Sequence, residues 1–293
     1  RSPNFRFNFY EQTLQNCRRR RYYHHRRSGH LSAHPFITMS SLQLIALCDF
    51  PLVKPGDDLA ALIQQALQHN AQTLCDGDIL VLAQKIVSKA ENRYRALNTV
   101  TPTTEAEKYA AETGKDPRMI ELVLQESKRV LRHRFGSIVV EHKLGFVHAN
   151  AGIDQSNLPD NSDSETALLL PENPDASAAA LRDTLQKNLH AKIAVVINDS
   201  FGRAWRLGTC GIAIGVAGFE PLLDLRGAPD LFGRKLEITQ VGIADEIAAA
   251  ASLLMGQAGE GSPVVIVRGF LWQPKENASV QTLLRKPHED MFR

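Results

Sequence analysis

The sequence lacks the marks of several common protein classes. It contains neither the GxxxxGK(S/T) pattern of a P-loop nor the GxGxxG pattern of a dinucleotide-binding fold. Its four cysteines, Cys17, Cys48, Cys75 and Cys210, form no CxxC pair and follow no regular spacing. Neither a zinc site nor a disulfide framework is therefore indicated, and a reducing, cytoplasmic compartment suits this cysteine usage.

Residues 1–38 differ from the rest of the chain in charge. They hold eight arginines, no lysine and one acid, a net charge of +7, which leaves the other 255 residues at −5. The run RRRRYYHHRR, from Arg18 to Arg27, has no apolar h-region, so it is not a secretory signal. It could be a nucleic-acid-binding arm, an organellar presequence or sequence upstream of a natural start at Met39. We favour the last, because folding signals begin after Met39, and we treat residues 39–293 as the folded unit.

The acidic body of the chain offers no basic patch, which counts against nucleic acid as the main partner. The apolar fraction of 43% supports a sizeable buried core. The apolar run IAVVI (193–197) is too short to span a membrane and is rich in β-branched residues, so it predicts a buried strand.

Two predicted strands end on carboxylates. The strand at 193–197 delivers Asp199 and Ser200 to its carboxyl end, where α/β sheets collect ligands, and a second strand runs into Asp154. These residue types are also common in turns, so a purely turn-shaping role stays open. Two acids beside hydroxyl and amide groups suit a hard divalent cation that carries nucleotide phosphates.

The remaining pattern mixes helices and short strands. We predict a strand at 42–48, a helix capped by Asp57 or Asp58, and, within 76–93, a turn followed by a strand through Ala83. Further along we predict helices within 103–134 and 176–190, a hairpin at 141–157, a mobile loop at 158–175, and a helix, glycine-rich loop and strand over 245–269. Lys85 and Lys89 follow a strand directly, and they could either hold phosphates or form a solvated face. The glycines of 256–261 would allow a ligand to approach the backbone, although Gly256 alone could be a helix cap.

Six motifs resemble those of the coenzyme F-420:L-glutamate ligases. They are GDDL (56–59), QKIVSKAENR (84–93), NAGIDQSN (150–157), INDSFGRAWRLGTCGIAIG (197–215), DLFGRKLEITQVGIADEIAAAASLLMG (230–256) and PVVIVRG (263–269). The resemblance covers about Leu47 to Gly269 in order, and residues 1–38 have no counterpart in it. It implies a dimeric, two-lobed α+β fold with mixed sheets and no P-loop. It also implies an enzyme that adds L-glutamate through γ-linkages to the deazaflavin coenzyme F-420, using GTP and Mg²⁺ or Mn²⁺, with stimulation by K⁺.

The resemblance also implies site residues. Its metal-binding positions match Asp154, Asp199 and Ser200. Its nucleotide-binding positions match Phe50, Pro51, Leu52, Val53, Gln84, Lys85, Lys89, Asn157, Met255, Gly256, Gln257, Ala258, Gly259, Glu260, Gly261 and Ser262. Lys89 and the two aspartates are the implied catalytic groups. In some relatives a Glu stands where Gln257 stands here, so a second metal ion is in doubt, while the acids for the first are intact.

The implied chemistry activates a carboxylate as an acyl phosphate, which the amine of glutamate then attacks. Such a reaction needs positioning and cations more than a covalent nucleophile. Two alternatives stay open. The chain could be a nucleotide-binding regulatory module without turnover, or a related amide-forming ligase with another carboxylate acceptor.

Overall fold

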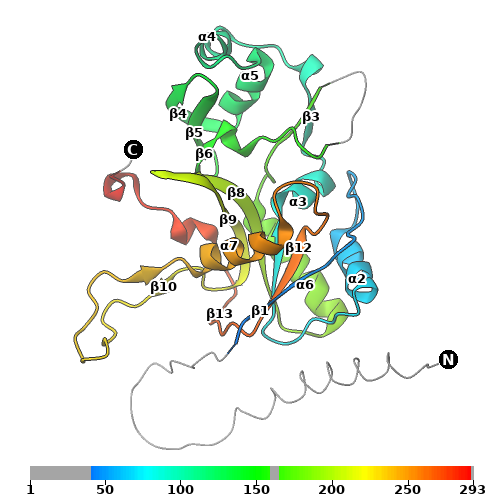
Figure 1. The fold of residues 1–293 in the computed structure, drawn as a ribbon, viewed down its shortest axis with the longest axis vertical. Coiled ribbons are helices and arrows are strands. Elements are labelled where there is room, and N and C mark those ends of the chain that lie inside the picture. Colours follow the sequence, from blue (N-terminus) through cyan, green and yellow to red (C-terminus); the bar gives the residue numbers. More distant parts are fainter. Residues whose placement is uncertain (1–40, 159–164, 292–293) are drawn as a thin grey trace, which may run out of the picture.

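The computed structural model describes residues 41–158 and 165–291 (Figure 1). The basic leader, residues 1–38, lies outside the described residues, so its predicted role is not addressed by the fold. Within the described ranges, no helix is both long enough and apolar enough to cross a membrane.

A six-stranded mixed sheet forms the centre of the molecule, in the order β1-β12-β2-β8-β9-β13 (Figure 1). Its strands are β1 (Gln43–Ala46), β2 (Ile79–Ala83), β8 (Ala194–Arg203), β9 (Arg206–Phe219), β12 (Val264–Arg268) and β13 (Pro274–Lys275). The β2–β8 pair is parallel, and every other neighbouring pair in this sheet is antiparallel. Strand β2 is apolar throughout because both of its faces are buried, as is usual where helices cover a sheet on both sides.

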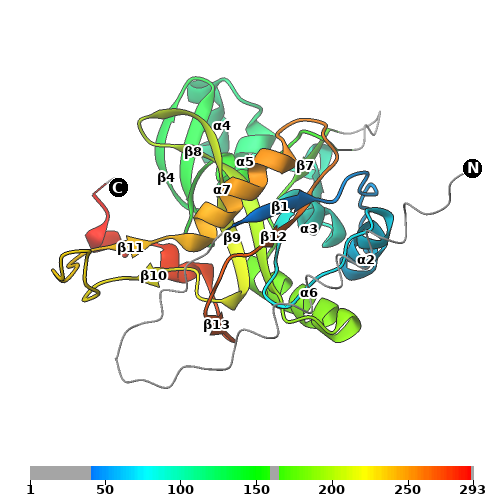
Figure 2. The same ribbon diagram turned by 60° about the horizontal axis from the view of Figure 1, so that its bottom comes forward.

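Helices cover both faces of this sheet (Figure 2). Helix α7 (Ile243–Met255) packs on one face, while α6 (Pro174–Leu189) packs on the other with α2 (Leu59–His69) beside it. At Gly211 of β9, an added Cβ would lie only 2.5 Å from the carbonyl oxygen of Ala248 in α7. A glycine is needed there because the helix and the strand approach so closely. Asp58 caps α2 by accepting hydrogen bonds from the backbone of Ala60 and Ala61, which confirms that prediction.

A second region with its own hydrophobic cluster stands above the central sheet in Figure 1. It contains α4 (Thr104–Thr113), α5 (Pro117–Gln125) and a three-stranded sheet of β4 (Ser127–Arg134), β5 (Ser137–His142) and β6 (Val147–Ala149). The smaller elements are α3 (Gln84–Ala90), the pair β3 (Tyr94–Ala96) and β7 (Thr166–Leu168), the pair β10 (Leu223–Asp224) and β11 (Gln240–Val241), and the 3-10 turns Leu97–Thr99, Asn150–Gly152, Val280–Leu283 and Pro287–Glu289. The fold is a mixed α+β architecture with several sheets, as predicted.

Three local predictions were wrong. The region 103–134 is helical only through Gln125, because residues 127–134 form β4, which pairs with β5. The loop predicted at 158–175 contains β7 and the first residues of α6. The strand at 193–197 does not end in a turn: β8 continues to Arg203, and a bulge between Ile197 and Asn198 shifts its register against β9.

The strand expected to end on Asp154 also ends earlier. In the predicted hairpin, β5 and β6 do pair, but β6 stops at Ala149 and a 3-10 turn follows. Asp154 lies beyond that turn, where its backbone exchanges hydrogen bonds with Leu168 of β7 at 3.0 and 2.8 Å. Both acids are therefore held by strand pairing, which rules out a mere turn-shaping role for Asp199.

Candidate functional site

The order of strands brings distant segments to one end of the central sheet. Because β2 and β8 are parallel, with Ala83 opposite Asn198, helix α3 leaves β2 beside Asp199 and Ser200. In α/β sheets, ligands commonly bind at such carboxyl ends of the strands. The first half of the site thus consists of α3 and the middle of β8.

The neighbouring strands add two more segments at the same end. Strand β12 is antiparallel to β2, so residues 255–262 enter there, and β1 is antiparallel to β12, so residues 50–53 leave there. The backbone N–H of Phe50 donates to the carbonyl of Gly261 at 3.3 Å. We call this end of the sheet the polar edge, made of residues 50–53, 84–89, 154–157, 199–200 and 255–262.

Two lysines of α3 hold the segment that carries Asp154. Lys85 Nζ lies 2.6 Å from Asp154 Oδ2 and donates to Ser156 Oγ at 3.0 Å. Lys89 Nζ donates to the carbonyl oxygen of Asn157 at 2.7 Å. Residues four apart share one helix face, so both ammonium groups point to the same side of α3. The polar edge therefore has two adjacent cations from a single helical turn.

Burial and charge shift the pKa values of this group. Burial lowers the pKa of Lys89 below its usual 10.5, and the nearby Lys85 ammonium lowers it further, while Asp154 partly opposes the shift. For Asp154, burial acts to raise the pKa, but hydrogen bonds from Lys85 and from the Ser156 N–H outweigh it, so the net pKa is lowered. Asp154 is thus ionised at neutral pH.

The second acid, Asp199, is held by a histidine of the second region and by the backbone of its own strand. Asp199 Oδ2 lies 3.1 Å from His148 Nε2, and Asp199 Oδ1 accepts the Ser200 N–H at 2.8 Å. The Ser200 hydroxyl donates to Gln257 Oε1 at 2.7 Å. Gln257 therefore contacts a predicted metal-binding residue directly, although as a neutral amide it brings no charge.

The loop at 255–262 joins the two acidic groups. Asn157 donates its side-chain N–H to the carbonyl of Ala258 at 2.8 Å, while Gln257 contacts Ser200. Inside the loop, the Glu260 carboxylate accepts the Ala258 N–H at 2.8 Å. One glycine-rich loop thus contacts both the Asp154 segment and the Asp199 strand.

Several predicted nucleotide-binding side chains serve the core instead of the polar edge. Phe50, Val53 and Met255 are buried in the main hydrophobic cluster. Gln84 is 4% exposed, and its amide oxygen accepts the hydroxyl of Ser88 at 2.8 Å. At these four positions a ligand at the edge could meet the backbone more readily than the side chain.

The oxygens of the polar edge suit a hard cation. Asp154, Asp199 and Ser200 offer carboxylate and hydroxyl ligands, the type preferred by Mg²⁺. Among the described residues, no three His, Cys, Asp or Glu side chains are grouped so as to hold an ion by themselves. The donor set therefore fits an ion that takes most of its ligands from phosphate and water, as Mg²⁺ commonly does.

His148 was missed by the sequence interpretation. It lies on β6 of the second region, and its pairing with Asp199 on β8 depends on how the two regions pack. Nothing in the local pattern around it, GFVHAN, distinguishes it from an ordinary strand residue. The alternation of residues along this segment predicts a strand, but it does not show that His148 contacts Asp199.

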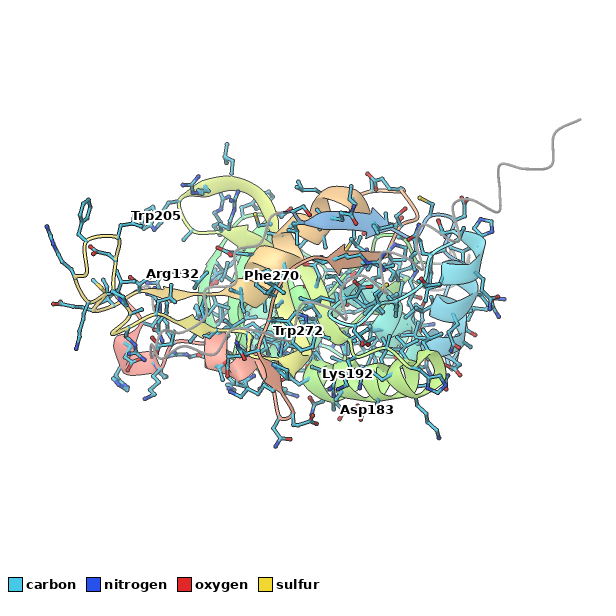
Figure 3. The ribbon with its side chains drawn as sticks, turned by 90° about the horizontal axis from the view of Figure 1, so that it is seen from below. Arg132, Asp183, Lys192, Trp205, Phe270 and Trp272 are labelled. Carbon is cyan, nitrogen blue, oxygen red and sulfur yellow. The ribbon has the colours of Figure 1, made fainter. Side chains whose placement is uncertain are left out.

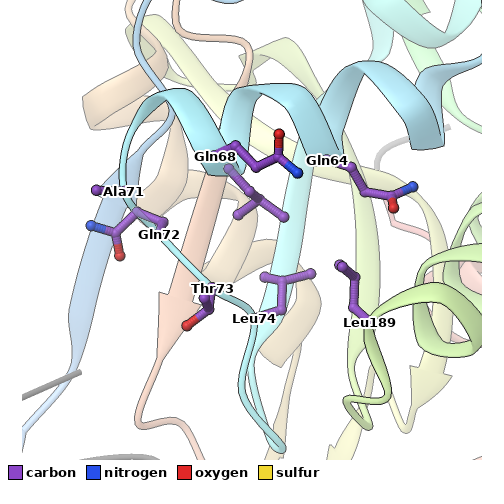
Figure 4. A pocket seen from close by; sticks show the side chains of 8 residues that line it. Gln64, Gln68, Ala71, Gln72, Thr73, Leu74 and Leu189 are labelled. Carbon is purple, nitrogen blue, oxygen red and sulfur yellow. The ribbon is translucent and has the colours of Figure 1, made fainter. Parts of the chain in front are cut away.

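Two cavities lie near the sheet, and neither is lined by the predicted charged residues. One, of about 320 Å³, lies between the end of α2 and Leu189 of α6, beneath Gln68 and above Thr73 (Figure 4). Arg268, at the far end of β12, donates to the carbonyl of Thr73, so this cavity is at the opposite end of the sheet from the polar edge. The other, of about 200 Å³, is mostly apolar and includes Phe201 and Asp245. Burial raises the pKa of Asp245, and an N–H from Ala213 only partly offsets this.

The chain is similar to known proteins along most of its length. The family model described as F-420-0:gamma-glutamyl ligase matches residues 48–269, which include the whole polar edge. The chain belongs to this family of ligases. A coenzyme F-420:L-glutamate ligase from Methanothermobacter thermautotrophicus is 47% identical over 253 residues, 86% of this chain and 99% of the relative.

Other gamma-glutamyl ligase relatives show the same extent of similarity. Proteins with the same name from Methanopyrus kandleri and Archaeoglobus fulgidus are 40% and 41% identical. The alignments cover 87% and 83% of this chain, and 100% and 93% of the relatives. The chain thus spans nearly the full length of these relatives, and the family predicted from the six motifs is confirmed.

Proposed function

We propose that this chain catalyses the GTP-dependent addition of L-glutamate, through a γ-linkage, to the coenzyme F-420. The names of its relatives support the two substrates. The single observation that carries the proposal is the convergence of five segments at the polar edge. Two lysines and two aspartates lie together there, on loops and strands that a nucleotide could reach.

The reaction proceeds through an acyl phosphate because a free carboxylate is a poor acyl donor. An oxygen of the acceptor's terminal carboxylate attacks the γ-phosphorus of GTP, and the bond from that phosphorus to its bridging oxygen breaks, which releases GDP. The neutral amine of L-glutamate then attacks the acyl carbon. The carbon–oxygen bond to the phosphate breaks, inorganic phosphate leaves, and the surplus amine proton passes to water.

The residues of the polar edge would mainly position and neutralise anions. Lys85 and Lys89 would turn from Asp154 and Asn157 toward the phosphates, where their charges reduce the repulsion between two anions. Asp154 and Asp199 would hold one Mg²⁺ or Mn²⁺, and the Ser200 hydroxyl, which leaves the other face of β8 beside Gln257, would be a weaker partner. When bound, such an ion neutralises phosphate charge and helps to orient the transferred group. A K⁺ requirement belongs to the proposal through family resemblance, and we assign it no residues.

Direct assay separates this proposal from its alternatives. Purified protein is given GTP, Mn²⁺, L-glutamate and the glutamate-free coenzyme, and phosphate release is measured beside mass spectrometry of the coenzyme. We expect both phosphate release and a product heavier by one glutamate residue, with neither when the coenzyme or the glutamate is omitted. GTP binding without turnover would instead support a regulatory module, and turnover only with a different acceptor would support a related ligase.

We also propose a homodimer. Two hairpins extend from the body (Figures 1 and 3), and both carry exposed apolar side chains. Trp205 at the β8–β9 tip is 91% exposed, and Leu231 and Phe232 in the β10–β11 connection are 100% and 87% exposed. Apolar groups gathered on extensions are typical of interaction sites. Light scattering of the parent and of Leu231→Ser with Phe232→Ser should show a dimer and a shift toward monomer, and a monomeric parent would contradict this part.

A further inference from the structure

His148 links the second region of the molecule to the polar edge. It belongs to β6, whose hydrogen-bonded partner is β5, yet its side chain reaches Asp199 on β8 of the central sheet. The Nε2–Oδ2 distance is 3.1 Å, and the two side chains are only 10% and 13% exposed. A contact of this length between two largely buried polar groups fixes both of them.

Aromatic packing holds the His148 ring in place. Its centroid lies 3.9 Å from that of Phe201, with the planes tilted by 46°, and Phe201 in turn meets Phe146 edge-on at 6.1 Å. Phe201 follows Asp199 by two residues on the same strand, so both side chains leave the same face of β8. The imidazole is therefore confined between the carboxylate that it contacts and the ring that supports it.

The chemistry of the contact indicates where the imidazole proton lies. A carboxylate oxygen accepts a hydrogen bond from a ring N–H, so the tautomer that makes this contact carries its hydrogen on Nε2. His148 Nδ1 is buried and has no hydrogen-bond partner among the described residues, which suits a bare acceptor nitrogen. Asp199 then receives one donor on each oxygen, His148 Nε2–H on Oδ2 and Ser200 N–H on Oδ1.

We infer that His148 is a positioning residue that fixes the orientation of the Asp199 carboxylate for a divalent cation. The inference rests on the proposed function, since the cation belongs to that proposal. With both oxygens hydrogen-bonded, the carboxylate cannot rotate freely, and each oxygen keeps a lone pair for an ion. Partners that orient metal ligands are worth about 10–100-fold in metal affinity. The second region thereby contributes His148 to the site, although the predicted metal ligands Asp154 and Asp199 both lie outside the β4–β5–β6 sheet.

The experiment measures Mn²⁺ binding to the full chain by electron paramagnetic resonance, with Mn²⁺ alone and with Mn²⁺ plus GDP. His148→Gln keeps an N–H donor near the Nε2 position, whereas His148→Leu removes it at similar bulk. We expect His148→Leu to raise the Mn²⁺ Kd about tenfold or more, and His148→Gln to raise it much less. Equal Kd values for the parent and a cooperatively melting His148→Leu protein would overturn the inference.

Two further measurements distinguish the inference from the proposed function. In an Asp199→Asn background, His148→Leu should cause no additional loss of Mn²⁺ affinity, because the positioned group is already gone. Nitrogen-15 NMR of the unaltered protein should show the His148 proton on Nε2, and a proton on Nδ1 instead would overturn the inference without any variant. If the parent binds no Mn²⁺ in either condition, the metal part of the proposed function fails and the inference falls with it.

Discussion

The two ends of the central sheet each hold an aspartate paired with a cation, but in very different surroundings. At the start of β2, Asp78 is completely buried and receives two hydrogen bonds from Arg268, at 2.9 and 2.6 Å, plus one from the Cys75 N–H at 2.7 Å. At the polar edge, Lys85 and Asp154 keep 22% and 31% of their side chains exposed. Similar charges are thus fixed at one end and accessible at the other.

The difference shows which pair is structural and which can exchange partners. The Arg268 guanidinium is planar and forks onto both Asp78 oxygens, and it also donates to the Thr73 carbonyl, so its geometry is fully determined. The Lys85 ammonium is a point charge on a flexible stem, which can turn to a phosphate at little cost. We therefore expect the first pair to govern stability and the second to govern ligand binding.

Breaking the buried pair should have the largest effect on stability. Asp78→Asn leaves the Arg268 charge buried without a counterion, which we expect to lower the free energy of unfolding by about 3–5 kcal/mol. Urea denaturation followed by circular dichroism measures this change. Asp76→Asn, at an exposed acid two residues earlier, is the matched control and should cost little. Comparable losses in both variants would contradict a special structural role for the buried Asp78–Arg268 pair.

At the polar edge, removing the lysine charge next to the Lys85–Asp154 pair should affect binding and not stability. Lys89→Met keeps the length of the stem but removes the charge, so we expect GTP affinity to fall about tenfold, the worth of one charge-assisted hydrogen bond. Lys187→Met, at an exposed lysine of α6, should leave GTP affinity unchanged. Calorimetric titration with GTP and thermal melting test both variants. If Lys89→Met binds GTP with the affinity of the parent, Lys89 is only part of a solvated helix face and holds no phosphate.

Asp245 offers a third case, a mostly buried acid that has no cation within ion-pair distance in the described part of the chain. Its pKa is raised by burial, so the folded state holds the proton more tightly than the unfolded state does. Ionisation of Asp245 therefore costs stability above its folded pKa and costs none below its unfolded pKa near 3.8. Asp245→Asn should stabilise the protein modestly at neutral pH, by less than Asp78→Asn destabilises it, and the gain should vanish toward pH 3. Urea denaturation at several pH values measures this, and a gain that persists at pH 3 would contradict the assignment.

Much of the fold follows from local signals in the sequence. The cap of α2 at Asp58, the strand that ends at Ala83, and the helix start at Asp116-Pro117 were all predicted from residue types alone. The error at 127–134 has a physical cause: this segment pairs with β5, and strand pairing is not visible in a single stretch. For the same reason, the continuation of β8 past Asp199 could not be read from its polar residues.

Both acids of the candidate site were predicted from the sequence, but the reason given, that each one ends a strand, was wrong. Asp154 and Asp199 do lie at one edge, yet neither stands at the end of its strand. Motif resemblance identified both acids without needing their geometry. His148 could not be found in either way, because its role depends on the packing of the second region against β8. Contacts between segments distant in sequence are therefore where the sequence was least informative.

The most direct test of a cation site at the polar edge is a Mn²⁺ titration of GTP-dependent phosphate release. It compares the parent with Asp154→Asn and Asp199→Asn, which preserve side-chain size and remove one negative charge each. Hard cations depend on that charge for affinity, so we predict a turnover at least about 100-fold lower, or a raised Mn²⁺ requirement, in proteins that still melt cooperatively. Parental turnover at low Mn²⁺ in both variants would contradict the assignment of a cation to these two acids.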